Sequence, residues 1–234
     1  MTDTLTDAPA ETPAPSPNQD ERTAPVSLVV LHYTGMRTGE AALARMRDPQ
    51  AKVSAHVMVG TDGRVFRMVP DDRRAWHAGV AEWRGQRDVN ARSVGIEVVN
   101  PGHEWGYEDF PEAQVGAVCR LVRAALDRFG LGPEAVIGHA DVAPHRKEDP
   151  GERFPWGTLA ARGLALPPWD GTVRAGVPEG ADALRLLEGI GYPVTAYGGA
   201  ACCVAFQRRF VPAELGQGLS PATRAAIGWA AALL

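Results

Sequence analysis

Two short apolar runs that each end at a histidine constrain the fold of this chain more than any other feature. Residues 27–31 lead to His32, and residues 135–138 lead to His139. Short apolar runs of this kind are typical of buried strands, so each run should carry its histidine to the rim of a sheet. Asp149 follows His139 by ten positions, across a loop that contains proline. The sequence therefore predicts that these three side chains meet at one edge of a sheet.

The three side chains form a typical set of ligands for zinc. Two imidazoles and one carboxylate leave the fourth position of a tetrahedral site open, whereas structural zinc sites usually take four protein ligands. A zinc ion lowers the pKa of its bound water to about 7 and polarises a carbonyl group, which favours hydrolysis. Taken singly, each residue could still be an ordinary loop or core residue. The set as a whole predicts Zn²⁺ as cofactor and hydrolysis as the reaction.

Five segments of the chain carry a family resemblance. In order and spacing they resemble the zinc N-acetylmuramoyl-L-alanine amidases of the AmpD and AmiD type, which are related to phage amidases and peptidoglycan recognition proteins. The resemblance extends from about residue 27 to residue 156. The segments that carry it are residues 31–34, 54–56, 74–79, 94–97 and 138–151.

The resemblance implies a role for each matching residue. His32, His139 and Asp149 would be the zinc ligands. Glu97 would be the catalytic acid/base, and Lys147 would stabilise the developing oxyanion. The bond cleaved in this family joins the lactyl group of N-acetylmuramic acid to the L-alanine that begins the stem peptide. No ligand position is substituted in this chain.

The residues around Glu97 fit the role that the resemblance implies. Val94, Ile96 and Val98 share one side of the predicted strand, so Glu97 points to the other side. A general acid/base must lie within hydrogen-bond reach of the proton that it transfers. Gly95 should leave room for the substrate to approach. From the strand pattern alone, an exposed glutamate remains the alternative.

Lys147 lies two residues before Asp149 in the same loop. A fixed positive charge there would stabilise an oxyanion by roughly 3 to 4 kcal/mol, by analogy with other oxyanion donors. A solvated loop lysine is the alternative. Arg146 beside it is ambiguous from the sequence.

Substrate contacts are expected in the irregular segment that follows residue 75. We expect Trp76, His77, Ala78 and Asn90 to contact the substrate, with Trp83 lining the same groove for sugar and peptide. Substrate contact is favoured over metal binding for the histidine of this set. Five arginines are candidates for binding peptide carboxylates, with exposed surface charge as the alternative for all of them: Arg73, Arg74, Arg84, Arg87 and Arg92.

The remaining histidines are predicted to bind neither the metal nor the substrate. His56 lies in an alternating apolar segment, which favours a structural role or a role behind the ligands. His103 and His145 fall in predicted loops near the site and match no ligand position, so we expect them to be exposed. The pair Asp62-Gly63 between two apolar segments predicts a hairpin with a tight turn.

The element order predicts an α/β fold with a mixed central sheet flanked by helices, and the resemblance implies the same architecture. The order is strand, helix, hairpin, long loop, strand, helix, strand and ligand loop. Residues 111–129 show an apolar stripe of helical period, begun by Pro111 and ended by Gly130. Thr38 should cap a short helix over residues 39–47. The zinc should sit at one rim of the sheet.

The chain divides into four predicted parts. Residues 1–24 form a disordered tail because they contain almost no large apolar side chain. Residues 25–165 form the catalytic domain, and residues 166–180 form a linker rich in proline and glycine. Residues 181–234 form a small three-helix domain that resembles peptidoglycan-binding domains. The alternative is a helical appendage that packs on the catalytic domain and binds nothing. Its own core would come from Leu184, Leu187, Ile190, Val204, Phe206, Phe210 and Ile227.

Composition limits the partners. The 234 residues carry a net charge of -4 and no basic run, so a nucleic acid is not an expected partner. No segment has the length of a membrane helix, and the first residues lack the pattern of a signal peptide. The three cysteines match no metal-ligand pattern and favour core packing in a reducing compartment. We therefore expect a cytoplasmic monomer whose partners are peptidoglycan fragments.

Two classes of function remain open at this stage. One is a zinc amidase, and the other is a recognition module that binds peptidoglycan without cleaving it. Binding-only relatives characteristically lose a ligand or the acid/base, and this chain retains all of them, which favours the enzyme. Within the enzyme class, recycling of anhydro-muropeptides is favoured over an attack on intact wall polymer.

Overall fold

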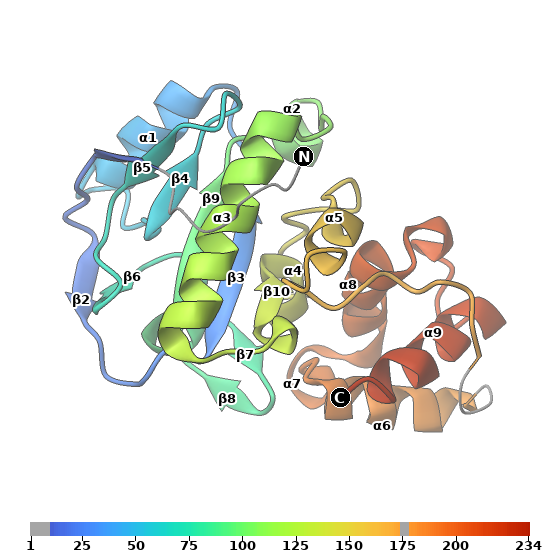
Figure 1. Cartoon of the computed structure of the whole chain (residues 1–234). Helices are drawn as coiled ribbons and strands as arrows, with labels where there is room; N and C mark the ends of the chain where they lie inside the picture. The colour runs from blue at the N-terminus through green and yellow to red at the C-terminus, as the bar shows by residue number, and fades with distance from the viewer. Residues whose placement is uncertain (1–9, 174–177) are drawn as a thin grey trace.

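A mixed sheet of six strands forms the centre of the computed structural model, which describes residues 10–173 and 178–234. The strand order is β1-β5-β4-β9-β3-β10, with β3 and β9 parallel in the middle (Figure 1). The pair β4 and β5 is antiparallel and forms the hairpin predicted around Asp62-Gly63. The strands are β1 (Glu11–Pro13), β3 (Leu28–Tyr33), β4 (Val57–Val59), β5 (Val65–Arg67), β9 (Ser93–Val98) and β10 (Val136–Gly138).

The α/β architecture and the predicted order of its elements are confirmed. Thr38 caps the first helix by accepting a hydrogen bond from the Ala41 N–H. Within the described residues, no helix is both long enough and apolar enough to span a membrane. The helices of this part are α1 (Gly39–Arg47), α2 (Gly102–Trp105), α3 (Glu112–Phe129), α4 (His139–Val142) and α5 (Trp156–Ala160), with short 3-10 turns at Val89–Arg92 and Pro133–Ala135.

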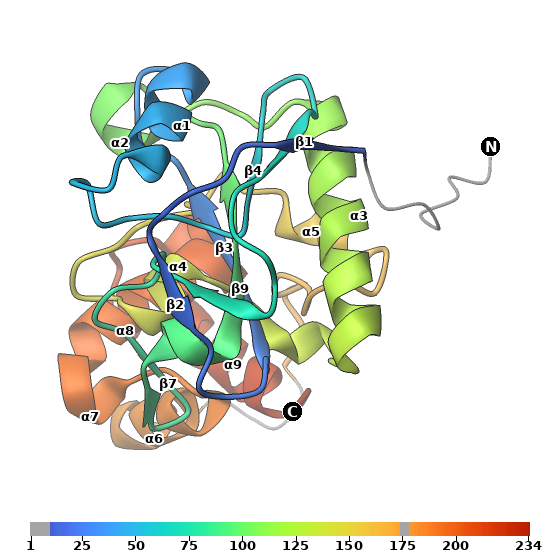
Figure 2. The same cartoon turned by 90° about the vertical axis from the view of Figure 1, so that its left-hand side faces the viewer.

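One face of the sheet is covered by α3, which lies along it in Figures 1 and 2. Val118 and Val122 of this helix belong to the same buried cluster as Leu31, Ile96 and Val98 of the two central strands. The helix follows Pro111 and ends at Gly130, whose φ of 63° lies in the left-handed region where glycine costs least. The apolar stripe read from the sequence is therefore the surface that packs on this face.

The opposite face carries alternate residues of the same strands. The parallel register pairs His32 with Glu97 and places Leu28 and Val30 on the side of His32. Leu28 and Val30 pack in a second cluster with Ile137, while α1 closes a third cluster. His32 and Glu97 are therefore polar residues on a face that is otherwise covered by protein.

The C-terminal helices complete the second cluster, and this corrects the predicted domain organisation. Leu187, Ile190, Phe206, Phe210 and Ile227 are buried in one cluster with Leu28 and Val30 of the sheet, so the predicted small separate core does not exist. Leu184 packs against the edge of that cluster, and Val204 is only partly buried. The elements are α6 (Gly180–Ile190), α7 (Val194–Tyr197), α8 (Gly199–Phe210), a 3-10 turn at Pro212–Glu214, and α9 (Pro221–Ala231).

A buried ion pair joins the two parts of the shared core. Arg209 of α8 donates to the Asp141 carboxylate of α4 at 2.9 Å, and the Tyr192 hydroxyl donates to the same carboxylate at 2.6 Å. Breaking a buried pair from one side costs about 3 to 5 kcal/mol, because the other charge stays buried. The C-terminal helices thus pack on the sheet as part of one body.

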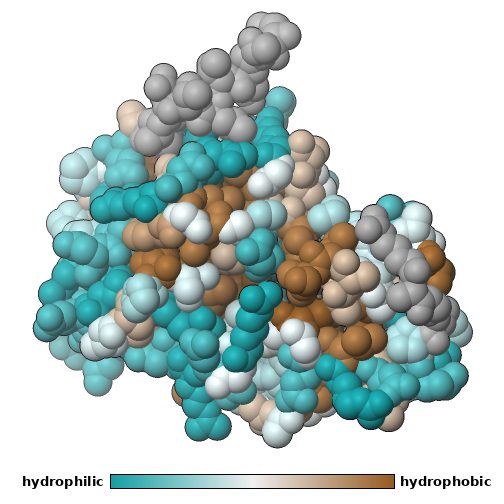
Figure 3. Space-filling model, turned by 60° about the horizontal axis from the view of Figure 1, so that its bottom comes forward, coloured by the Kyte–Doolittle hydropathy of each residue, from teal (hydrophilic) through white to brown (hydrophobic). Residues whose placement is uncertain are grey.

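On the face shown in Figure 3, hydrophobic residues gather near the middle within a hydrophilic margin.

The predicted linker is only partly an open connection. Leu166 and Trp169 pack against the shared core, and the backbone N–H of Trp169 donates to the Phe210 carbonyl. Residues 174–177 lie outside the described residues. The predicted role of the cysteines in core packing is confirmed, since Cys119, Cys202 and Cys203 are all buried.

The prediction of a disordered tail is wrong for residues 10–24. β1 pairs with β5 at the edge of the sheet, and β2 (Gln19–Glu21) pairs with β6 (Arg73–Ala75), as Figure 2 shows from that side. The buried Asn18 amide donates to the carbonyls of Met46, Asp48 and Val53. Polar contacts to distant backbone hold this segment, so its low apolar content gave the wrong prediction. Residues 1–9 lie outside the described residues.

Candidate metal centre

Three buried side chains meet at the carboxyl ends of the strands, as the sequence predicts. His32 comes from β3, His139 begins α4 directly after β10, and Asp149 comes from the loop after α4. The Nδ1 atoms of the two histidines lie 2.9 Å apart, and Asp149 Oδ2 lies 3.0 Å from the first and 2.9 Å from the second. All three residues are at most 5% exposed. Their ligand atoms could hold one metal ion.

The hydrogen-bond partners of His32 fix its tautomer. The Ser93 hydroxyl donates to the Val89 carbonyl at 2.6 Å, so its oxygen accepts from His77 Nε2 at 3.0 Å. His77 Nδ1 is then an acceptor, and it receives the Nε2 proton of His32 at 2.9 Å. Burial, with His139 next in importance, lowers the pKa of His32 to about 4, which favours the neutral ring. His32 Nδ1 therefore presents a lone pair to the centre.

His139 reaches the same state through a different partner. Its Nε2 donates to the Ala78 carbonyl at 3.1 Å, since a carbonyl can only accept. Its Nδ1 is then also a lone pair, facing His32 Nδ1 and the Asp149 carboxylate. Three acceptor atoms at hydrogen-bond distances repel one another unless a cation lies among them. The donor set of this centre therefore fits a metal ion, with both imidazoles held by a second contact as metal ligands usually are.

Glu97 lies on the same face as His32, as predicted, and is 9% exposed. Its Oε2 is buried and has no hydrogen-bond partner among the described residues. Burial, and to a smaller extent Asp149, raise the pKa of Glu97 well above its usual value. A carboxyl group with a raised pKa and an unsatisfied oxygen is suited to accept a proton and to return it.

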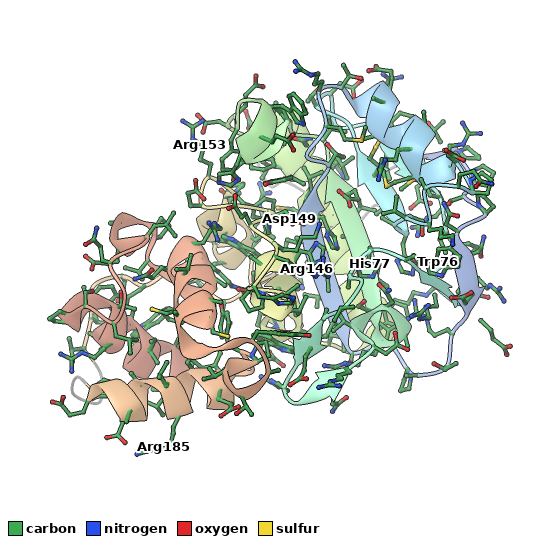
Figure 4. The ribbon with its side chains drawn as sticks, turned by 180° about the vertical axis from the view of Figure 1, so that it is seen from behind. Trp76, His77, Arg146, Asp149, Arg153 and Arg185 are labelled. Atoms are coloured by element: carbon green, nitrogen blue, oxygen red, sulfur yellow. The ribbon has the colours of Figure 1, made fainter. Side chains whose placement is uncertain are left out.

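A polar cavity of about 670 Å³ opens above the centre. Glu97, His139, Asp149 and Lys147 line it, so both predicted catalytic residues and two of the three predicted ligands share one space. Lys147 is partly buried. The ambiguous Arg146 has a structural role, because its guanidinium donates to the carbonyls of Ala78 and Val80. Figure 4 shows Arg146, Asp149 and His77 close together in the middle of the molecule.

The four predicted substrate contacts occupy different places. His77 lines the cavity but is buried, and its ring is bonded to His32 and Ser93. Ala78 is fully buried, and the Asn90 Oδ1 accepts from the N–H groups of His77 and Ala78, so both residues support the centre from behind. Trp76 donates to Asp20 and lies away from the centre in Figure 4.

Two further expectations about this region are wrong. Gly95 leaves room for a protein side chain, not for substrate, because a Cβ atom there would lie 2.5 Å from the His77 ring. Trp83 lines no groove, because it is buried in the shared core against Tyr192. An indole of this size is as well suited to a helix interface as to a sugar, and the sequence alone does not distinguish them.

The other histidines lie as predicted. His56 is fully buried, and its Nδ1 accepts the Gly95 N–H at 2.9 Å, which confirms a structural role. His103 and His145 are exposed. Each has a partner at the rim of the cavity: His103 contacts the Tyr33 hydroxyl, and His145 stacks on Tyr197 of α7.

The five candidate arginines do not line the cavity. Arg74 pairs with Asp20 and Asp88, and Arg87 pairs with Glu82. Arg73 contacts Gln19, while Arg84 and Arg92 donate to backbone carbonyls. The cationic residues that do line it are Arg45, Arg146, Lys147 and Arg208.

Two residues that line the cavity come from the C-terminal helices, for which the sequence predicted no residue of this site. Val204 and Arg208 belong to α8, more than fifty positions beyond Asp149. No local motif surrounds them, and their place follows only from how the C-terminal helices pack on the sheet.

Comparison with known proteins gives consistent matches. The sequence model of the family described as N-acetylmuramoyl-L-alanine amidase matches residues 22–152. N-acetylmuramoyl-L-alanine amidase AmiD of Escherichia coli K12 is 36% identical over 155 residues, which cover 61% of this chain and 55% of AmiD. The 1,6-anhydro-N-acetylmuramyl-L-alanine amidase AmpD of the same organism is 35% identical over 161 residues, which cover 61% of this chain and 86% of AmpD.

Solved structures resemble a larger part of the chain. AmiD from E. coli, in complex with anhydro-N-acetylmuramic acid-L-Ala-D-γ-Glu-L-Lys, has a TM-score of 0.77 and 32% identity over 88% of this chain and 89% of its own. AmpDh3 from Pseudomonas aeruginosa has a TM-score of 0.78 and 30% identity over 86% of this chain and 89% of its own. These two likenesses extend into the C-terminal helices, because residues 1–180 make up only about 77% of the 234 residues.

Proposed function

The chain belongs to the N-acetylmuramoyl-L-alanine amidase family, and we propose that it hydrolyses the amide bond between N-acetylmuramic acid and L-alanine with the help of zinc. The observation that carries the proposal is the convergence of three lone-pair donors on one point, beside a Glu97 carboxyl group whose buried Oε2 has no partner among the described residues. His32, His139 and Asp149 would hold the zinc ion.

The proposed reaction needs one proton acceptor that later becomes a donor. Zinc, when bound, would polarise the amide carbonyl and acidify water. Glu97 accepts a proton from the attacking water, whose oxygen forms a bond to the lactyl carbonyl carbon. The same carboxyl group then returns the proton to the nitrogen of L-alanine as the C–N bond breaks. The products are a lactyl carboxylate and a peptide with a free amino group.

Lys147 supports this reaction by charge. It lines the cavity from the same loop that carries Asp149. Its positive charge lowers the pKa of Glu97 and so opposes the larger effect of burial, which raises that pKa. In the reaction it stabilises the negative charge that develops on the amide oxygen, because a fixed cation in a poorly solvated cavity needs no rearrangement.

The substrate proposed is an anhydro-muropeptide, and the setting proposed is recycling in the cytoplasm. AmpD is named for an anhydro-muramyl substrate, and AmiD was crystallised with an anhydro-muropeptide. The three buried cysteines, which form no disulfide among the described residues, agree with a reducing compartment. The alternative setting is intact wall polymer, which the resemblance of the C-terminal helices to peptidoglycan-binding domains favours. A monomeric state stays a prediction, which size-exclusion chromatography with light scattering would check.

The test is hydrolysis of a defined substrate. The zinc-loaded protein is incubated with anhydro-N-acetylmuramic acid-L-Ala-D-γ-Glu-L-Lys, and mass spectrometry follows release of the tripeptide. We expect release with zinc, and none after chelation, with recovery on adding zinc back. Binding of the muropeptide without release at any zinc concentration would favour the recognition module instead. Initial rates on equal amounts of soluble muropeptide and intact sacculi then separate recycling from attack on the wall.

A further inference from the structure

The cavity above the metal centre has walls from two parts of the chain. On one side, Thr34, Gly35, Arg45 and Val53 line it and continue into an adjoining cavity of about 330 Å³ next to α1. On the other side, the wall includes Val204 and Arg208 of α8 and His145 of the ligand loop. The C-terminal helices are thus a part of the cleft itself.

The cations in this cleft differ in their freedom to bind a ligand. Arg146 is occupied by two backbone carbonyls. Lys147 is assigned to the developing oxyanion by the proposed function. Arg45 is exposed in the last turn of α1, where water competes for it. The side chain of Arg208 is only 11% exposed, so an ionic contact to it is poorly screened.

Arg208 has donors to spare. Its Nε lies 3.2 Å from the Glu152 carboxylate, and that is the ion pair that holds the side chain. A guanidinium carries five N–H groups, four of them on the two terminal nitrogens. Those nitrogens have no partner among the residues that the structure describes, and neither is a buried unsatisfied atom. Glu152 therefore anchors one edge of the guanidinium while the other edge is open.

The position of the open edge suggests what it binds. It lines the same cavity as His139 and Asp149, whereas Arg73, Arg74, Arg84, Arg87 and Arg92 do not. Terminal nitrogens of arginine bind carboxylates through two parallel hydrogen bonds. The stem peptide of the proposed substrate carries carboxylates beyond its L-alanine.

We propose that Arg208 binds a carboxylate of the stem peptide, so that α8 sets the specificity of the amidase for acidic peptides. This inference rests on the proposed function for its substrate. It also gives the C-terminal helices a role that differs from the separate wall-binding domain that the sequence suggested. Val204 beside Arg208 supplies an apolar surface for the peptide in the same wall.

Kinetics with two matched substrates test this. One is anhydro-N-acetylmuramic acid-L-Ala-D-γ-Glu-L-Lys, and the other has the same sequence with its peptide carboxylates amidated. For Arg208→Gln we expect KM for the acidic substrate to rise roughly 10- to 100-fold, the range for a lost charge-assisted hydrogen bond, with kcat within about twofold. KM for the amidated substrate should stay unchanged. Arg208→Lys, which keeps the charge but not the paired donors, should recover part of the loss.

Two control variants separate binding from a structural effect. Arg185→Gln removes an exposed arginine of α6 at the far end of the C-terminal helices, as Figure 4 shows, and should change neither KM. Glu152→Gln breaks the same ion pair from the other side but leaves the guanidinium, so it should not raise KM for the acidic substrate. Equal increases of KM in the Glu152 and Arg208 variants, for both substrates, would overturn the proposal.

A binding measurement makes the result independent of catalysis. The tripeptide L-Ala-D-γ-Glu-L-Lys is titrated calorimetrically into the zinc-loaded wild type and into Arg208→Gln, whose thermal unfolding is checked first. We expect binding to weaken roughly 10- to 100-fold in the variant. If the wild type cleaves neither substrate, the proposed function fails, and this titration alone decides the role of Arg208. Equal affinities would rule that role out.

Discussion

The two faces of the central sheet are built from alternate residues of the same strands and serve different purposes. On the face that α3 covers, Val29, Leu31, Ile96 and Val98 form an apolar layer. On the other face the pattern is interrupted, since His32 and Glu97 lie side by side between two apolar clusters. A face packed without interruption stabilises the fold, whereas an interrupted face leaves room for a reaction.

Neighbours in sequence make this contrast testable. Ile96 and Glu97 are adjacent in β9 but point to opposite faces, and both are at most 9% exposed. If the division holds, substitutions on the α3 face change the free energy of unfolding and leave the activity of folded molecules intact. Substitutions of His32 or Glu97 should lower the activity and leave the free energy of unfolding nearly unchanged.

The largest effect is expected from loss of a ligand on the interrupted face. His139→Ala removes one of three donors, so zinc binding should weaken by more than about 100-fold, the upper range for changes to residues that only support a ligand. Hydrolysis should fall to the chelated level. Competition with a chromophoric chelator measures the affinity. His145→Ala, an exposed histidine of the same loop, is the control and should keep the affinity of the wild type.

Glu97→Gln should have the next largest effect, and only on the reaction. The amide has nearly the same shape but cannot transfer a proton, so kcat should fall by about 10²- to 10⁴-fold. Zinc affinity should be retained. The free energy of unfolding should be equal to that of the wild type or higher, because the substitution removes a buried carboxyl group without a partner. A variant that loses activity together with bound zinc would contradict the role of acid/base.

Ile96→Ala tests the other face. The residue is 1% exposed under α3, and truncation of such a side chain costs about 2 to 5 kcal/mol of unfolding free energy. Urea denaturation would measure this loss. The kcat of the folded fraction should stay within about twofold of the wild type. A fall in kcat as large as that of the Glu97 variant would show that the two faces are not separable.

The sequence predicted those features that depend on local periodicity. The stripe of α3, the hairpin at Asp62-Gly63 and the strand alternation that turns Glu97 away from Ile96 are each visible within one element, and the structure confirms them. The convergence of His32, His139 and Asp149 is also confirmed, because strands of a parallel sheet bring their carboxyl ends to one edge.

The features that the sequence did not predict depend on contacts between distant segments. An apolar stripe on α8 shows that the helix is buried but not that its partner is the sheet, so the shared core and Arg208 were missed. Polar Asn18 orders its segment through carbonyls thirty or so positions away. Gly95 gave a correct signal of close approach, but the approaching group is the His77 ring.

One histidine on the interrupted face sharpens the comparison, because its role is structural. His56 is buried at the start of the β4 strand and accepts the Gly95 N–H, which requires an unprotonated Nδ1. Burial lowers its pKa to about 4, and the hydrogen bond to the Arg73 carbonyl offsets only part of that effect. The unfolded chain has a histidine pKa of about 6.5, so between these values the unfolded state binds more protons than the folded state.

Stability should therefore fall as the pH falls from about 6.5 to about 4, and His56 should contribute roughly 2 to 3 kcal/mol to this loss. Unfolding free energies from urea titrations at pH 7.5 and pH 4.5, in the presence of chelator, would measure it. His56→Gln is less stable at pH 7.5 but should lose less on acidification, because glutamine does not titrate. Other buried histidines titrate in both proteins, so the difference between the two losses reports on His56. Equal losses would show that His56 does not contribute, and the acid sensitivity of this face would then belong to its other buried histidines.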